Sequence, residues 1–228
     1  GAVNYEAIVF LNGKEIGQHI GGFTPFNFEV TNALKNGENS LVVKVDNKRK
    51  LEAVPTINTD WWNYGGITRE VTLIETPATF VRDYYVQLKK SDKNLIQGWI
   101  QLDGKQLAKS LKLEIPELKI VQRLTPDANG YAAFEIKAKP LLWSPENPKL
   151  YKVNITVDNE TLTDEIGFRT IETKGTQILL NGKPVFLRGI CIHEEAAFSN
   201  SRAYSKEQDI TLLQWARDMG CNFVRLAH

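Results

Sequence analysis

The 228-residue sequence has few cysteines, no long apolar run and no excess of charge of either sign. Its two cysteines, Cys191 and Cys221, are too few for a disulfide-stapled fold, and we expect both to be buried free thiols. No apolar run approaches the roughly 18 residues that a membrane-spanning helix needs. Gly1-Ala2-Val3 begins inside a strand-like pattern rather than a signal peptide, so we expect the natural N-terminus to lie further upstream.

The charge balance argues against polyanionic partners. The chain carries 28 basic and 27 acidic residues, and its longest basic run is Lys48-Arg49-Lys50. Neither a nucleic acid nor an anionic membrane is therefore indicated, and a neutral partner fits better. A composition with 42% hydrophobic and 24% charged residues is that of a soluble globular protein, which leaves cytoplasmic, periplasmic and secreted locations open.

The first part of the chain predicts short antiparallel strands. Asn12-Gly13 stands between two apolar runs, which is a strong signal for a two-residue hairpin. Alternation over residues 26–30 and apolar runs over 41–45 and 69–74 predict further strands of a β-sandwich.

An aromatic loop, residues 60–67, precedes the last of these strands. Paired glycines beside three aromatic residues predict a rigid loop that presents a platform to a ligand, since sugars dock on aromatic faces through their C–H groups. The alternative is that Trp61, Trp62 and Tyr64 close the end of the sandwich core.

Beyond Pro77 the sequence predicts an immunoglobulin-like sandwich. About seven short strands fall within roughly ninety residues, which is the density expected for that fold. We expect these strands at residues 80–88, 96–102, 111–115, 119–124, 131–138, 150–157 and 161–169. A proline-locked crossover precedes the sixth strand, and Trp143 within it is expected to seal the core.

The closing segment changes character. Asn181-Gly182 repeats the hairpin signal, and residues 186–192 are apolar almost throughout, as in strands that are buried on both faces of a parallel sheet. Ser205 and Gln208 form a capping box at the start of a helical pattern, and Gly220 stands where that helix should end. A second apolar run follows, so the pattern predicts one βαβ unit.

Two histidines, His193 and His228, end the two strands of this unit. Parallel strands send their C-terminal ends to the same edge of a sheet, so we expect the two side chains to lie side by side. That edge is where open α/β sheets and barrels bind ligands. Metal ligation is less favoured, because the pair lacks HExxH spacing and a clear third ligand.

Four separated motifs resemble glycoside hydrolase family 2, the family of β-galactosidases, β-glucuronidases and β-mannosidases. Residues 11–26 and 60–69 resemble its jelly-roll sugar-binding domain, residues 142–151 the end of its immunoglobulin-like domain, and residues from Gly167 onward the entry to its catalytic barrel. The resemblance implies a partial jelly-roll domain, an immunoglobulin-like β-sandwich and the first βαβ unit of a TIM (β/α)8 barrel, with bounds at 1–76, 77–171 and 172–228.

The resemblance also implies a retaining β-glycosidase that hydrolyses terminal β-linked sugars and is most like β-galactosidase. One glutamate would attack the anomeric carbon and another would protonate the leaving oxygen. Both are expected beyond residue 228, so no catalytic residue is assigned within this chain, which alone is expected to hydrolyse nothing. Glu194 and Glu195 are not expected to be this pair, because adjacent residues point in different directions.

By the same resemblance, five residues are assigned to substrate binding. His193 and His228 match the barrel histidines that hydrogen-bond the glycone hydroxyls, and neutral imidazole both donates and accepts. Arg225 and Glu194 match family positions too, with a purely structural ion pair between them as the alternative. Asp60 matches a β-galactosidase loop aspartate that contacts the sugar and a bound sodium ion, with turn capping as its alternative.

No cofactor is expected, although the resemblance implies a Na⁺ or Mg²⁺ ion with Asp60 as its candidate ligand. One departure bears on specificity, since Cys191 and Ile192 stand where many members have Asn and Arg or Lys. A β-glucuronidase, a non-catalytic carbohydrate-binding module and a structural interaction protein stay open as alternatives. An incomplete barrel exposes strand edges and apolar faces, so association into a homo-oligomer is also expected.

Overall fold

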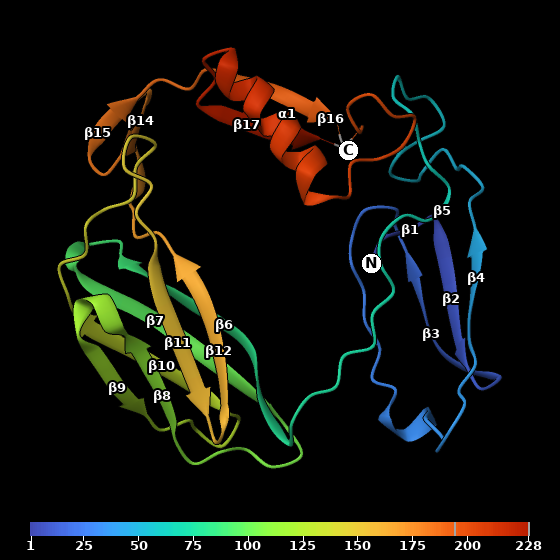
Figure 1. Ribbon diagram of the computed structural model, residues 1–228, viewed down its shortest axis with the longest axis horizontal. Helices are drawn as coiled ribbons and strands as arrows, with labels where there is room; N and C mark the ends of the chain where they lie inside the picture. The colour runs from blue at the N-terminus through green and yellow to red at the C-terminus, as the bar shows by residue number, and fades with distance from the viewer. Residues whose placement is uncertain (194, 228) are drawn as a thin grey trace. The chain divides into compact units, whose positions relative to one another are not determined.

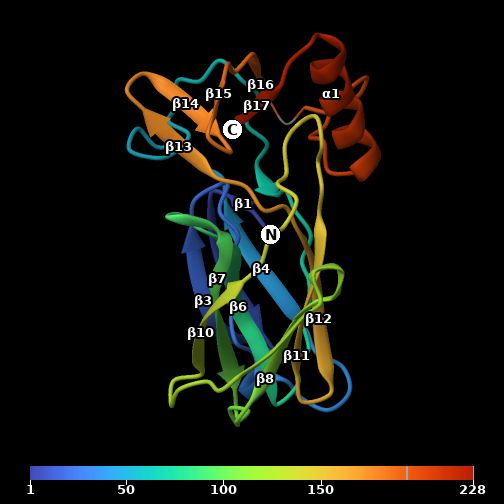
Figure 2. The same cartoon turned by 90° about the vertical axis from the view of Figure 1, so that its left-hand side faces the viewer.

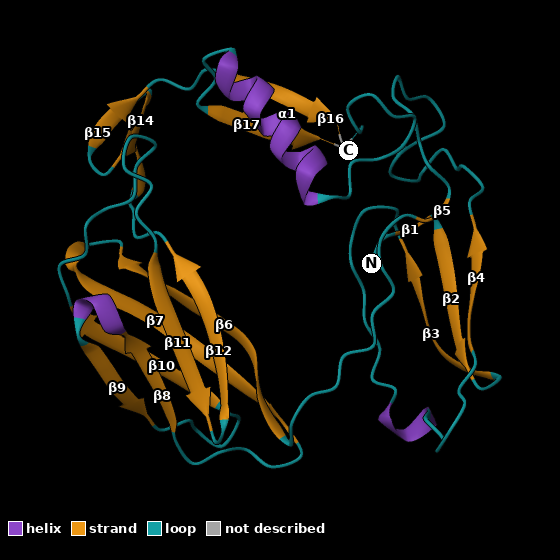
Figure 3. Ribbon diagram, viewed as in Figure 1, coloured by secondary structure: helices purple, strands orange, loops and turns teal. Residues whose placement is uncertain are grey.

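A computed structural model describes residues 1–193 and 195–227. It divides into two compact units. The first unit comprises Gly1–Ile74, Cys191–Trp215 and the residues from Arg225 on, and the second comprises Glu75–Ile190 and Ala216–Val224. Strands dominate, and the described residues contain a single α-helix, α1 (Lys206–Asp218), as Figure 3 shows. No helix among them is long and apolar enough to cross a membrane.

A three-stranded antiparallel sheet in the order β3-β2-β4 forms the framework of the first unit (Figure 1). Its strands are β2 (Glu6–Leu11), β3 (Lys14–Ile20) and β4 (Leu41–Asp46), with a short 3-10 helix, η1 (Thr31–Ala33), between β3 and β4. Asn12 and Gly13 both have positive φ, 54° and 81°, so the predicted hairpin between β2 and β3 is confirmed.

Two strands predicted in this unit are wrong. Residues 26–30 form no strand; instead Phe26 stacks on His19 with ring centroids 4.4 Å apart, and Phe28 lies so close to Gly17 that a Cβ there would stand 2.4 Å from its ring. Packing of aromatic rings on β3 therefore replaces a β-ladder. In place of a strand over 69–74, the two-residue strand β5 (Gly66–Ile67) pairs with β1 (Val3–Asn4).

Two sheets, β10-β7-β6 and β12-β11-β8-β9, form the sandwich of the second unit (Figures 1 and 2). All seven strands predicted here are confirmed, and their bounds are β6 (Thr79–Lys89), β7 (Asp92–Gly104), β8 (Leu111–Ile115), β9 (Ile120–Leu124), β10 (Tyr131–Lys137), β11 (Tyr151–Val157) and β12 (Glu160–Ile166). A 3-10 helix, η2 (Pro116–Leu118), links β8 to β9. Residues of both sheets share one core, in which Ile100, Leu113 and Ile155 are at most 1% exposed.

The end of this core is closed by Phe168 rather than by Trp143. Phe168 is fully buried, and its ring lies against Tyr151 with centroids 5.6 Å apart. Trp143 is only half-buried; it packs on Gly167, and the Arg169 guanidinium lies 5.2 Å from its ring. The indole therefore covers the segment that follows β12.

A small antiparallel sheet follows the sandwich, made of β13 (Ile171–Lys174), β14 (Gln177–Leu180) and β15 (Lys183–Val185). Positive φ values of 56° and 81° at Asn181 and Gly182 confirm the second predicted hairpin. The Asn181 amide donates to the Trp143 carbonyl (2.9 Å), which ties this sheet to the sandwich.

The strand–helix–strand order of the closing segment is confirmed as β16 (Gly189–His193), α1 and β17 (Phe223–Ala227). Ser205 Oγ accepts from the Gln208 N–H and Gln208 Oε1 accepts from the Ser205 N–H, both at 3.3 Å, which is the predicted capping box. Gly220 ends the helix at a φ of 77°, where its N–H donates to the Arg217 carbonyl.

Burial of this segment differs from the prediction. Along β16 the side chains alternate between exposed and half-buried, Cys191 is exposed and Cys221 is half-buried, and both thiols are free. The reason is that β16 pairs with β17 in a two-stranded sheet, so no further described strand covers its edges. Two strands and one helix do not make a barrel, so the TIM (β/α)8 part of the predicted fold class stays a prediction.

Candidate functional site

The strands β16 and β17 run parallel. Arg188 N–H donates to Asn222 Oδ1 (2.8 Å), and Arg225 Nη1 donates to Cys191 Sγ (3.7 Å), with 34 residues separating both pairs. Antiparallel partners would show a separation that changes along the strand, whereas a constant separation is that of parallel neighbours. The C-terminal ends of the two strands therefore lie at one edge, as the sequence predicts.

His193 stands at this edge and meets the aromatic loop. Its side chain is exposed, and its ring lies edge-on to Trp61 with centroids 6.3 Å apart and planes at 78°. Asp60, directly before Trp61, is also exposed. The structure thus brings the loop that carries one predicted site residue to the strand end that carries another, a contact that no local sequence signal indicates.

The remaining predicted residues are placed only in part. Arg225 lies exposed on β17 beside Cys191. Glu194 and His228 lie outside the described residues, so neither the predicted pairing of the two histidines nor the alternative Arg225–Glu194 ion pair is tested. Glu195 makes an isolated antiparallel bridge with Arg202, just beyond the strand end.

Hydrogen bonds fix the aromatic loop. The Asn4 amide donates to the Tyr64 carbonyl, and the Asn63 amide donates to Thr59 Oγ1, both at 2.8 Å. A Cβ at Gly65 would stand 2.4 Å from the Asn47 amide, so a larger residue there would displace the Asn47 side chain. These contacts agree with the predicted rigidity of the loop.

The three aromatic residues of the loop divide between the two predicted roles, a platform for a ligand and closure of the core. Trp62 is 71% exposed, and its ring lies edge-on to Tyr64 with centroids 6.3 Å apart. Trp61 and Tyr64 are half-buried, and the Arg202 guanidinium lies 6.0 Å from the Tyr64 ring. Core closure therefore does not account for Trp62, whose indole is available to a ligand.

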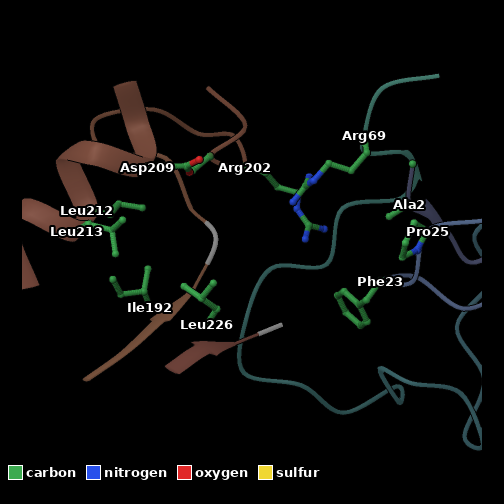
Figure 4. A pocket seen from close by; sticks show the side chains of 12 residues that line it. Ala2, Phe23, Pro25, Arg69, Ile192, Arg202, Asp209, Leu212, Leu213 and Leu226 are labelled. Carbon is green, nitrogen blue, oxygen red and sulfur yellow. The ribbon is translucent and has the colours of Figure 1, made fainter. Parts of the chain in front are cut away.

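A cavity of about 630 Å³ lies within the first unit, next to this edge (Figure 4). Its apolar wall includes Phe23, Ile192 and Leu226. Arg69 and Arg202 reach into it from opposite sides, as Figure 4 shows.

The two arginines form a cationic cluster in this cavity. Burial, and then the positive charge of Arg202, lowers the pKa of Arg69, whereas the Asp209 carboxylate raises it. Burial also lowers the pKa of Arg202. An anionic group between two guanidiniums would relieve their repulsion. Arg69 stands inside a recognised motif, but sequence reasoning gave it no role, and nothing in the sequence around Arg202 signals one.

The described residues do not form a metal centre. Nowhere in residues 1–193 and 195–227 do three or more His, Cys, Asp or Glu side chains come together in a way that can hold a metal ion. Asp60 alone would offer a carboxylate, and Na⁺ or Mg²⁺ requires several oxygen ligands. An ion at Asp60 would therefore need carbonyl or amide oxygens or water as its other ligands.

Comparison with known proteins covers both units. Residues 1–77 match the model for the glycosyl hydrolases family 2 sugar binding domain, and residues 79–169 match the model for glycosyl hydrolases family 2. A β-glucuronidase of Bacteroides fragilis is 30% identical over an aligned length of 255 residues, gaps included. The alignment covers 99% of this chain and 36% of the relative. A β-galactosidase of Thermoanaerobacter pseudethanolicus is 29% identical, over 97% of this chain and 32% of the relative's own length.

A solved structure shows the same fold. The β-glucuronidase of Bifidobacterium dentium, complexed with coumarin-3-O-glucuronide, superposes with a TM-score of 0.87 at 25% identity over the whole of this chain and 44% of its own. The chain therefore spans between about a third and under half of the length of these relatives.

Proposed function

Because the chain belongs to glycoside hydrolase family 2, we propose that it supplies a glycone-binding half-site to a retaining enzyme that hydrolyses terminal β-linked sugars. Its parts would be a partial jelly-roll domain over 1–76, an immunoglobulin-like β-sandwich over 77–171 and the opening βαβ unit of a (β/α)8 barrel over 172–228. The two family matches, which meet near residue 78, support the first of these boundaries.

One observation carries this proposal: the parallel pair β16–β17 ends at His193, and the loop bearing Asp60 meets that end through Trp61. Ligands of barrel enzymes bind at the C-terminal ends of the strands. A neutral imidazole can donate to one sugar hydroxyl or accept from it, and a carboxylate accepts from another.

The other assigned residues complete the half-site. His228 would stand beside His193 at the neighbouring strand end, with Glu194 next to it and Arg225 orienting acidic groups. The attacking and proton-donating glutamates would come from later barrel strands, on opposite sides of the scissile bond. The chain itself would bind and orient the glycone and contribute no catalytic carboxylate.

The first candidate substrate is a β-galactoside, and the second is a β-glucuronide. The names of the relatives favour the second as strongly as the first, because both a β-galactosidase and β-glucuronidases match over nearly the whole chain. The two sugars differ in the orientation of the 4-hydroxyl and in an exocyclic carboxylate, and the carboxylate requires a cation. Arg225 offers a guanidinium on the same pair of strands.

The test uses the complete enzyme with nitrophenyl β-galactoside and nitrophenyl β-glucuronide. We expect His193→Asn to lower kcat/KM about 100-fold on the preferred substrate, and Asp60→Ala to raise KM. His19→Asn is the matched control, since His19 lies on β3, stacks on Phe26, and belongs to no proposed site; its kinetics should equal those of the wild type.

Three results would contradict the proposal. Unchanged kinetics in His193→Asn on both substrates would remove the glycone role. Glycan binding by the complete protein without hydrolysis of either substrate would favour the non-catalytic binding module. Turnover by the 228-residue chain alone would show that the catalytic carboxylates lie within it.

A further inference from the structure

The outer face of the sheet β10-β7-β6 carries a row of aromatic side chains that takes no part in the proposed glycone half-site. On β7 the side chains of Ile96 and Ile100 are fully buried in the sandwich core. Residues alternate along a strand, so Trp99 faces outward. The register places Tyr85 of β6 and Ala133 of β10 on either side of Trp99.

A shallow hollow of about 580 Å³ lies over this row. Tyr85 is 46% exposed and Tyr131 is 41% exposed. Tyr131 stacks on Trp99 with ring centroids 6.1 Å apart and planes at 26°, which holds the indole in place. Ala133 of β10 is much smaller than Trp99, its cross-strand partner, and the step between these two side chains forms one side of the hollow. The volume lies within the range of roughly 300–1,000 Å³ that is usual for ligand sites.

Polar groups lie beside the aromatic floor, since Gln97 and Glu135 line the hollow and Lys89 pairs with Glu135. Gln97 lies two residues before Trp99 on the same face, and its amide makes no hydrogen bond within the part of the chain that the structure describes. Lys89 of β6 and Glu135 of β10 form an ion pair at 2.6 Å that spans β7. An ammonium donates, a carboxylate accepts and an amide does both, and the net charge of the ion pair is zero.

This combination fits a sugar better than other ligands. A pyranose ring presents C–H groups that pack on an aromatic face, and its hydroxyls need both donors and acceptors nearby. Because the ion pair is neutral overall, the hollow does not select a charged ligand.

We propose that Tyr85, Trp99 and Gln97 form a carbohydrate-binding surface for neutral glycans. One sugar ring packs on the Trp99 indole against the Tyr85 ring, and the Gln97 amide binds its hydroxyls. This surface requires none of the residues of the proposed glycone half-site.

The test is native electrophoresis of the full chain in gels that contain soluble galactan or mixed-linkage β-glucan. We expect the wild type to be retarded in at least one of these gels. Trp99→Ala and Tyr85→Ala should each raise the apparent Kd about tenfold. Val121→Ala is the control, because Val121 is 67% exposed on β9 of the other sheet, and it should be retarded like the wild type.

Three results would contradict the proposed carbohydrate-binding surface. Migration of the wild type without retardation in both gels, or equal retardation of Tyr85→Ala and the wild type, would overturn the proposal. Retardation only in a third gel that contains polygalacturonate would overturn it too. Tyr85 is exposed, so its loss should leave Tm unchanged and separate lost binding from unfolding. In the complete enzyme, Tyr85→Ala should have the same kcat/KM for a nitrophenyl glycoside as the wild type, because Tyr85 lies outside the glycone half-site. The gel result is therefore independent of whether the proposed glycosidase function holds.

Discussion

The hydrogen bond between Tyr84 and Asp164 makes the sandwich sensitive to high pH. Tyr84 Oη on β6 donates to Asp164 Oδ2 on β12 at 2.7 Å, which joins the two sheets. Burial, and then the hydrogen bond and charge of Asp164, raises the pKa of Tyr84 from 10.0 to about 12. Tyr84→Phe removes this hydroxyl and leaves the ring.

The sign of the pH effect follows from this shift. Below about pH 10 the phenol is protonated in both the folded and the unfolded chain, so its stabilisation is fully present. As pH rises from about 10 to about 12, the unfolded phenol ionises first and the stabilisation is lost. A shift of about two units corresponds to at most about 2.7 kcal/mol. The phenol is only half-buried, so solvent screening reduces the expected contribution to about 1 kcal/mol.

Urea unfolding followed by tryptophan fluorescence measures this contribution. At about pH 8 we expect Tyr84→Phe to be about 1 kcal/mol less stable than the wild type, and the difference should shrink towards zero as pH approaches about 12. Other groups titrate in the same range, but they are common to both proteins and cancel in the difference. Tyr85→Phe, adjacent on β6, is the control, since its hydroxyl makes no hydrogen bond to any described residue. A stability difference that stays constant with pH would refute the reasoning.

Three further substitutions test the packing and the helix ends. Phe168→Ala should destabilise the sandwich by about 3–5 kcal/mol, because a fully buried ring leaves a cavity beside Tyr151; denaturant unfolding measures it, and a loss below about 1 kcal/mol would contradict the packing. Ser205→Ala should weaken the first turn of α1 by about 1 kcal/mol, seen as faster amide hydrogen exchange at Gln208. Gly220→Ala should cost about 1 kcal/mol because φ there is 77°, and unchanged exchange in the last turn of α1 would argue against that strain.

The elements that the sequence predicts well are those with a local cause. Both Asn-Gly hairpins need only the left-handed preference of two adjacent residues, and the capping box needs only Ser205 and Gln208. The strands of the sandwich follow from alternation and turns, because each strand has one face on a common core.

The predictions that failed each required knowledge of a partner. Residues 26–30 alternate as a strand does, but alternation reports a buried face and not a hydrogen-bonded neighbour, and Phe26 finds its partner in the His19 ring. Likewise, apolar composition predicted that β16 is buried on both faces, yet burial depends on which elements cover it. The contact of Trp61 with His193 and the meeting of Arg69 with Arg202 are long-range too, and no local pattern encodes them.

The same distinction explains why the proposed glycone site lies outside the sandwich. The sandwich of the second unit completes its own core, and Leu113 and Val153 in it are fully buried. In the closing segment, by contrast, Met219, just after α1, is 64% exposed, and Leu226 on β17 is 79% exposed. Local rules therefore suffice for the part that packs on itself. The proposed glycone site, however, forms where the Asp60 loop meets the end of β16, through the long-range contact of Trp61 with His193 that no local rule encodes.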